Sequence, residues 1–268
     1  GEKFIKITGE VGTGKTLLCR HILQDISDRY MCAFVANPYL TPRSVLLAIV
    51  EELGISEEIP GDNAQLLEVI RNNLLEHKKA GKQLVFLIDE AQAMTPESIL
   101  ELAKLTDIRY RDRPLVQIIL FGQPELDDLL ATEGLRKVSR ELAISYNLPA
   151  LNEQEVAAYL RHRLDKAGSP VLDLFSDKAV ADLNAASKGL PRLINILAHK
   201  ALIVAFGRDN SSVSDIHIRR SIEESGQVPS ASGMKRGFGL SAHRNSFFFL
   251  AMVSSSLTLI AVYMMVLS

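Results

Sequence analysis

The sequence has few cysteines and no excess of basic charge, and both shortages argue against whole classes of protein. Cys19 and Cys32 are the only cysteines, form no metal-ligand pattern and are too few for a disulfide framework. The chain has 30 Lys and Arg against 32 Asp and Glu, whereas a protein that grips duplex nucleic acid is usually basic. The six histidines show no ligand spacing either. We therefore expect reduced core thiols in a cytosolic domain.

The start of the chain lacks a targeting signal. Gly1 is not a methionine, and no secretory or transit sequence follows it. Because the chain enters almost directly into a strand pattern, we expect a fragment that is missing its natural start. Its 268 residues suffice for one α/β core and a small second domain.

The first half of the chain alternates strand and helix patterns, which favours a parallel sheet with crossover helices. Several of the apolar runs are apolar at consecutive positions, as in strands covered on both faces. The strands are predicted at 4–7, 33–36, 84–88, 115–121 and 142–148. Thr41-Pro42 and Thr95-Pro96 predict helix starts between them. The expected fold class is an α/β core over 1–148.

The second half of the chain becomes helical from Pro149 onward. Asn152 with Glu155 predicts a capping box, and further helices are expected at 176–186, 193–206 and 214–224. We predict a small helical domain over 149–225, followed by a flexible basic linker rich in Ser and Gly over 226–246.

The segment 247–268 contains no charged residue. Because about 20 helical residues at ~1.5 Å each cross a hydrocarbon core of ~30 Å, the segment predicts one transmembrane helix. Positive charge precedes it at Lys235, Arg236 and Arg244. The positive-inside bias then places the preceding domains in the cytoplasm.

A glycine-rich segment follows the first predicted strand and precedes a helical pattern. It fits G-x-x-x-x-G-K-[ST], whose backbone N–H groups turn toward phosphate oxygens at the positive end of a helix. Lys15 is expected to reach the β- and γ-phosphates of ATP, and Thr16 to bind Mg²⁺. The predicted nucleotide-binding residues are Gly9, Glu10, Val11, Gly12, Thr13, Gly14, Lys15, Thr16 and Leu17.

Polar side chains follow two of the predicted strands. Asp89 is placed to hold Mg²⁺ through water, and Glu90 to polarise the water that attacks ATP, so the pair argues for hydrolysis. Gln123, after the next strand, is predicted to orient that water as sensor 1. Arg192, in a Gly-Leu-Pro-Arg segment, is predicted to contact the γ-phosphate as sensor 2.

These motifs together resemble the ExeA/GspA family of AAA+ ATPases, most closely its MshM branch from type IV pilus biogenesis. The most specific segments are Asn-Pro-Tyr-Leu at 37–40, Asp-Glu-Ala-Gln-Ala-Met at 89–94 and Phe-Gly-Gln-Pro-Glu-Leu at 121–126. The resemblance covers residues 1 to about 225. It implies an ASCE-type P-loop NTPase with a three-layer α/β/α core, strand order 5-1-4-3-2 and a helical lid over 149–225.

The resemblance also implies a role and partners. ATP would drive an oligomer, a ring or a dimer, that helps assemble an MSHA-like pilus or a type II secretion apparatus in the bacterial inner membrane. The expected partners are assembly proteins of that membrane and, through 247–268, the bilayer itself. DNA is not expected to be a partner.

One departure from the family concerns the arginine finger, a side chain that enters a neighbouring subunit's site. The family commonly has an Arg-Gln-x-x-Gln-Arg-Ile-like segment before the fifth strand, and here Glu141 stands where an arginine is usual. Arg136 and Arg140 remain the candidates.

Two other functions stay open. A DNA-binding AAA+ regulator of the transposition type shares this core, and the basic loop with Arg109, Arg111 and Arg113 supports it. A nucleotide-gated scaffold with little turnover is supported by the altered segment around Glu141.

Overall fold

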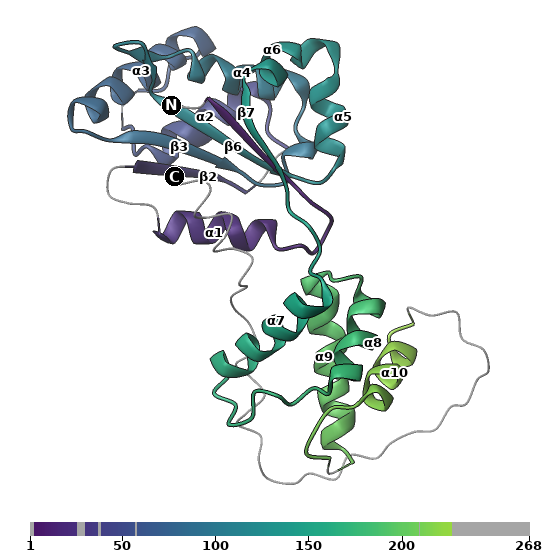
Figure 1. Cartoon of the computed structure of the whole chain (residues 1–268). Helices are drawn as coiled ribbons and strands as arrows, with labels where there is room; N and C mark the ends of the chain where they lie inside the picture. The colour runs from purple at the N-terminus through teal and green to yellow at the C-terminus, as the bar shows by residue number, and fades with distance from the viewer. Residues whose placement is uncertain (1–2, 26–29, 37–38, 57, 209, 227–268) are drawn as a thin grey trace. The chain divides into compact units, whose positions relative to one another are not determined.

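The structure is a computed structural model that describes residues 3–25, 30–36, 39–56, 58–208 and 210–226 (Figure 1). Contacts between Cα atoms divide the chain into two compact units. The first comprises Gly1–Val11 and Lys15–Pro149, and the second comprises Gly12–Gly14 and Ala150–Ser268. Each unit has a hydrophobic core of its own.

The first unit is built on a five-stranded parallel sheet in the order β2-β3-β6-β1-β7. The strands are β1 (Phe4–Thr8), β2 (Tyr30–Val35), β3 (Gln83–Ile88), β6 (Val116–Gly122) and β7 (Leu142–Asn147). All five predicted strands are confirmed, with shifts at their ends. Numbered among themselves, they run 5-1-4-3-2, the order that the family resemblance implies.

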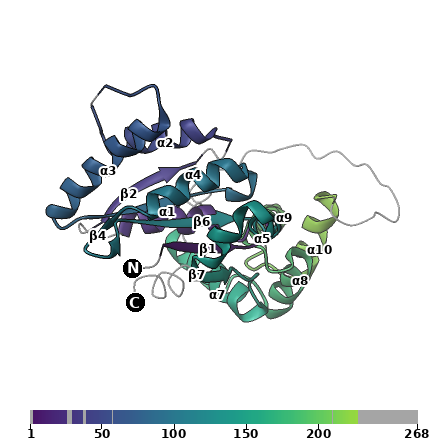
Figure 2. The same ribbon diagram turned by 90° about the horizontal axis from the view of Figure 1, so that it is seen from above.

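Helices cover both faces of the sheet, which gives the three layers of the expected α/β/α core (Figures 1 and 2). On one face lies α1 (Lys15–Asp25), which contacts β6. The helices that share the larger core include α2 (Pro42–Glu52), α3 (Asn63–Lys79), α4 (Pro96–Thr106) and α5 (Glu125–Ala131). Strand residues alternate between the two layers, so that Phe86 and Ile88 of β3 belong to the larger core and Leu87 does not.

Both cysteines are free, as expected. Cys19 is buried with Leu18 and Ile22 on α1, and Cys32 on β2 is half-buried. Burial raises the pKa of Cys19 to about 12 and that of Cys32 to about 11. Both thiols are therefore protonated and unreactive at neutral pH.

Some elements of the first unit were not predicted from the sequence. A small antiparallel hairpin pairs β4 (Arg109–Tyr110) with β5 (Arg113–Pro114). Its turn residues, Arg111 and Asp112, have positive φ of 49° and 64°, the pattern of a two-residue type I′ turn. Three short helices also escaped prediction, namely η1 (Ala91–Ala93), η2 (Glu133–Leu135) and α6 (Arg136–Arg140).

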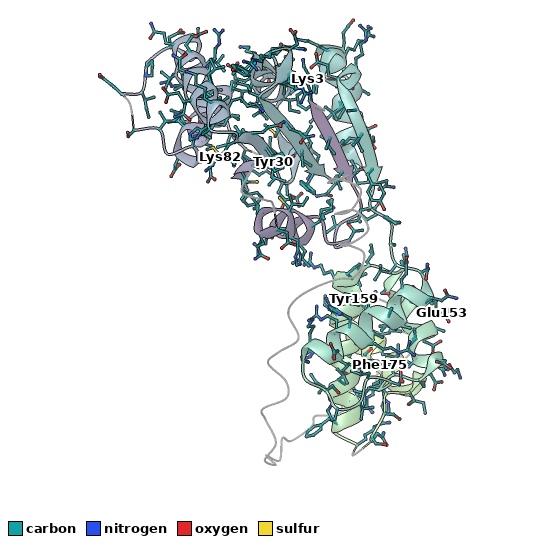
Figure 3. The ribbon with its side chains drawn as sticks, turned by 60° about the vertical axis from the view of Figure 1, so that its left-hand side comes forward. Lys3, Tyr30, Lys82, Glu153, Tyr159 and Phe175 are labelled. Atoms are coloured by element: carbon teal, nitrogen blue, oxygen red, sulfur yellow. The ribbon has the colours of Figure 1, made fainter. Side chains whose placement is uncertain are left out.

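The described part of the second unit is helical. Its helices are α7 (Glu153–Lys166), α8 (Asp177–Ser187), α9 (Pro191–Phe206) and α10 (Asp215–Glu224). Tyr159 and Phe175 are buried in its core (Figure 3). The predicted capping box is confirmed, since Asn152 Oδ1 accepts from the Glu155 N–H at 3.0 Å and Glu155 Oε2 accepts from the Asn152 N–H at 2.8 Å.

One glycine and one histidine stabilise this unit in specific ways. Gly189, just before α9, has φ of 70°, and a Cβ there would lie 2.0 Å from the carbonyl oxygen of Leu151. His217 on α10 is buried, and its Nδ1 accepts from the Ser214 N–H at 3.0 Å. Burial, aided by the charge of Arg208, lowers the pKa of His217. The imidazole is therefore neutral when the unit is folded at neutral pH.

The prediction of a single-pass inner-membrane protein is contradicted. None of the helices in the described part of the chain is both long and apolar enough to cross a bilayer. The segment 247–268, to which the spanning helix was assigned, and nearly all of the linker 226–246 lie outside the described residues.

Candidate nucleotide-binding site

The loop between β1 and α1 is shaped by its glycines and its lysine. Gly12 and Gly14 have φ of 91° and 106°, values that residues with side chains rarely adopt. Lys15 is buried, and its Nζ donates to the carbonyl oxygens of Gly9 at 2.7 Å and Glu10 at 3.0 Å. The ammonium is therefore held within the curve of the loop, beside the amino end of α1, where phosphate oxygens are bound in P-loops.

Burial and nearby carboxylates have opposite effects on the pKa of Lys15. Burial lowers its pKa, while Glu90 and Asp89, and after them Glu10 and Glu125, act to raise it. A cation taken out of water and faced by carboxylates is typical of a functional site rather than of a solvated surface.

Thr16 and Asp89 meet directly beside this loop. Thr16 Oγ1 donates to Asp89 Oδ2 at 2.6 Å, and Asp89 Oδ1 accepts from the Glu90 N–H at 3.0 Å. A hydroxyl and a carboxylate are hard oxygen donors of the kind that Mg²⁺ prefers. The two predicted metal ligands are therefore brought together, and they fit Mg²⁺.

This pair would supply only part of the coordination of a cation. Among the described residues, no group of three or more His, Cys, Asp and Glu side chains is arranged to hold a metal. A site that offers few protein ligands suits Mg²⁺, which usually keeps several waters and shares the phosphates of a nucleotide.

Glu90 follows Asp89 in a left-handed backbone conformation, with φ of 53° and ψ of 36°. Its Oε2 accepts from Gln92 Nε2 at 2.6 Å and from Gln123 Nε2 at 3.1 Å. The hydrogen bond from Gln92, then that from Gln123 and the charge of Lys15, lower the pKa of Glu90 against the opposing effect of burial. Glu90 is therefore ionised at neutral pH and able to accept a hydrogen bond from water.

The structure thus gathers Thr16, Asp89, Glu90 and Gln123, a set that we call the carboxyl-edge site because its last three members follow the carboxyl ends of β3 and β6. Gln92 was not predicted as a site residue. The sequence offered one signal for it, an amide between two alanines in Asp-Glu-Ala-Gln-Ala-Met. Its partner Gln123, however, lies 31 residues further along the chain.

The remaining predicted residues are not members of the carboxyl-edge site. Arg136 and Arg140 are the first and last residues of α6, and the exposed Arg136 pairs with Glu133 at 3.6 Å. Arg192 is exposed in the first turn of α9, in the second unit. Val11 and Leu17, at either side of the loop, are exposed apolar side chains. The roles assigned to these residues stay predictions.

Glu141 has a structural partner that the sequence did not indicate. Lys3 Nζ donates to Glu141 Oε1 at 3.1 Å and to Asp107 Oδ1 at 2.7 Å, and Lys137 Nζ donates to Asp107 Oδ2 at 2.9 Å. Lys3 and Glu141 immediately precede β1 and β7, and Figure 3 labels Lys3. We call these four residues the amino-edge network.

Comparisons with known proteins bear on the family and the fold. The family model described as an AAA domain matches residues 1–130. General secretion pathway protein A of Aeromonas hydrophila is 39% identical over 213 residues, which cover 80% of this chain and 39% of that protein. The chain therefore spans less than half the length of this relative.

Several solved structures share the fold. Cdc6p from Pyrobaculum aerophilum matches with a TM-score of 0.66 and 14% identity, covering 84% of this chain and 62% of that chain. The Aeropyrum pernix ORC2 protein matches with a TM-score of 0.60 and 18% identity over the same shares of the two chains. The Thermotoga maritima RuvB Holliday junction branch migration motor matches with a TM-score of 0.54 and 16% identity, covering 83% of this chain and 61% of that chain. At such identities the likeness shows the fold alone.

The sequence relationship goes further than the fold. At 39% identity over 80% of its residues, the chain belongs to the ExeA/GspA family of AAA ATPases, which its motifs resemble.

Proposed function

We propose that this chain binds ATP with Mg²⁺ and hydrolyses it to drive the assembly of a type II secretion or type IV, MSHA-like pilus apparatus. The observation that carries the proposal is the carboxyl-edge site, where a metal-binding pair and an ionised glutamate lie together beside a phosphate-binding loop. A module that only bound nucleotide would not need the second carboxylate.

Each residue of the site has a distinct task in this reaction. Mg²⁺, when bound, neutralises charge that develops on the phosphate oxygens. Thr16 and Asp89 hold the ion, and Lys15 binds the phosphates. Glu90 accepts a hydrogen bond from the attacking water, and Gln123 orients that water.

The machine and its partners are inferred from the family. The relative's name places that protein in general secretion, and this chain spans 39% of its length. We propose secretion or pilus assembly proteins as partners. We also propose that the chain belongs to the MshM branch of the family. We also propose a ring or dimer in which Arg136 or Arg140 enters the neighbouring site, and a lid over 149–225 in which Arg192 senses the γ-phosphate.

Phosphate release by the full chain, measured with and without Mg²⁺ over a range of protein concentrations, tests the proposal. We expect Mg²⁺-dependent turnover whose specific activity rises with concentration, because an arginine finger completes the site between subunits. Lys15→Ala is expected to lose ATP binding. Glu90→Gln is expected to keep ATP binding and lose turnover. Tight binding by the wild type without turnover would instead support the nucleotide-gated scaffold.

A DNA-binding regulator is the second candidate, and the hairpin of β4 and β5 favours it. Arg109, Arg111 and Arg113 are all exposed there, and the Arg111 guanidinium lies 5.3 Å from the centre of the Tyr110 ring. Binding of duplex DNA by the full chain at several salt concentrations tests this candidate. Affinity that falls steeply with salt, and that is lost when the three arginines are replaced by alanine, would establish it.

A further inference from the structure

A side chain outside the proposed reaction scheme also contacts Glu90. Gln92 belongs to η1, the turn that follows β3. Its Nε2 donates to Glu90 Oε2 at 2.6 Å, and its Oε1 accepts from the backbone N–H of Gln123 at 3.0 Å. A backbone N–H can only donate and an ionised carboxylate can only accept, so these two partners fix the orientation of the Gln92 amide.

The glycine before Gln123 leaves room for this amide. A Cβ at Gly122 would lie 3.1 Å from Gln92 Oε1 and 2.8 Å from Leu126 Cδ2. A side chain at position 122 would therefore crowd both the Gln92 oxygen and Leu126. Two segments that are distant in sequence, Asp-Glu-Ala-Gln and Phe-Gly-Gln, thus meet through a single side chain.

Gln92 also lies where the backbone is under local strain. Glu90 is a non-glycine residue in the left-handed region, and such residues persist only when their surroundings hold them in place. Gln92 ties the Glu90 side chain to the end of β6, a buried strand.

We propose that Gln92 is a positioning residue that holds Glu90 in place for hydrolysis and couples it to Gln123. The inference rests on the proposed ATP hydrolysis. Both amides bond to Oε2 of Glu90, which directs its other oxygen, Oε1, to the attacking water. If the amide of Gln123 turns toward the γ-phosphate, Gln92 still holds Oε2, because its own oxygen is anchored on the Gln123 backbone.

Two substitutions test this contact. Gln92→Ala removes both hydrogen bonds of the amide, the one to Glu90 Oε2 and the one from the Gln123 N–H. Gln92→Glu keeps the shape of the side chain but replaces the donor to Glu90 by a second carboxylate, and the two like charges repel.

The test compares steady-state hydrolysis of ATP by the full chain and its variants. Gln92→Ala is expected to lower kcat by about 10- to 100-fold, the scale of misplacing a reacting group, with KM changed by less than about twofold. Gln92→Glu is expected to lower kcat at least as much. Gln65→Glu, which adds the same charge on the exposed start of α3, is expected to match the wild type.

A second measurement does not depend on turnover. Hydrogen exchange at the backbone N–H of Gln123, which donates to Gln92 Oε1 at 3.0 Å, is expected to be faster in Gln92→Ala than in the wild type. An unchanged kcat, or unchanged exchange at Gln123, in Gln92→Ala would overturn the proposal. If the wild type binds ATP without turnover while exchange at Gln123 still responds to Gln92, the proposed hydrolysis fails and the contact of Gln92 with the Gln123 backbone is established.

Discussion

The two ends of the strands in the five-stranded sheet both carry clusters of charged side chains, but the charges are balanced at one end and unbalanced at the other. In the amino-edge network, two lysines pair with two carboxylates of the same chain. In the carboxyl-edge site, Asp89 and Glu90 lie near the cation Lys15, which is held by backbone carbonyls. A balanced cluster serves the fold, whereas surplus oxygen donors beside a phosphate-binding loop are suited to a divalent cation.

The largest expected effect comes from removing the negative charge of Asp89 from the carboxyl-edge site. Asp89→Asn is expected to lower ATP turnover by about 100-fold or more, because bound Mg²⁺ supplies several kcal/mol of transition-state stabilisation. A Mg²⁺ titration of turnover measures the effect. The control is Asp128→Asn, which removes an exposed carboxylate on α5. Unchanged Mg²⁺ dependence in Asp89→Asn would mean that the carboxyl-edge site does not bind the ion.

A substitution outside both clusters is expected to lower stability, and it shows the effect of folding apart from that of the chemistry. Gly189→Ala is expected to destabilise the second unit by about 3 kcal/mol, since its Cβ would collide with the Leu151 carbonyl. Gly168→Ala is the matched control, because Gly168 has a similar φ of 72° and nothing within 4 Å of a Cβ. Denaturant unfolding followed by circular dichroism compares the two. Equal losses in both variants would contradict the collision.

Breaking the balanced cluster should cost stability and leave the chemistry intact. Glu141→Arg places a cation beside Lys3, and we expect a loss of about 1–3 kcal/mol in the free energy of unfolding. Glu141→Gln, which keeps an oxygen acceptor for Lys3, should lose less. Below the unfolding temperature, turnover of Glu141→Arg should equal that of the wild type. A rise in turnover would instead show that position 141 faces a neighbouring site, as an arginine finger does.

The smallest expected effect concerns a titratable group outside both clusters. The folded-state pKa of His217 lies below its value of about 6.5 in the unfolded chain, so the unfolded state takes up the proton first. Stability is therefore full above pH 6.5 and falls as the pH drops through and below that value. His217→Asn, whose Oδ1 can still accept from Ser214, should flatten this dependence in unfolding measurements at pH 7.5 and 5.5.

The parts of the site that were predictable from the sequence are those carried by short segments. The P-loop, the strand that Asp89 follows and the capping box of Asn152 each place their partners within a few residues, so spacing alone identifies them. The five strands were predictable for the same reason, because consecutive apolar residues indicate a covered sheet.

The parts that could not be predicted depend on contacts between distant segments. Gln92 acquires its partner only when β3 and β6 pair, and Glu141 meets Lys3 only when β7 pairs with β1. The β4–β5 hairpin escaped because Arg111 and Asp112 fill turn positions where Asn and Gly are the usual signals. The membrane prediction used the hydrophobicity of 247–268 and the positive charge that precedes it, and it is contradicted.

The helix α1 contributes both to the candidate site and to the packing of the first unit. Its first residues, Lys15 and Thr16, belong to the nucleotide-binding loop and the metal-binding pair, and its buried residues, Leu18, Cys19 and Ile22, line the inner side of the layer it forms. A ligand bound at the amino end of α1 therefore also restrains the motion of one layer of the fold. Nucleotide occupancy should therefore be detectable away from the phosphates, as slower hydrogen exchange along the whole of α1.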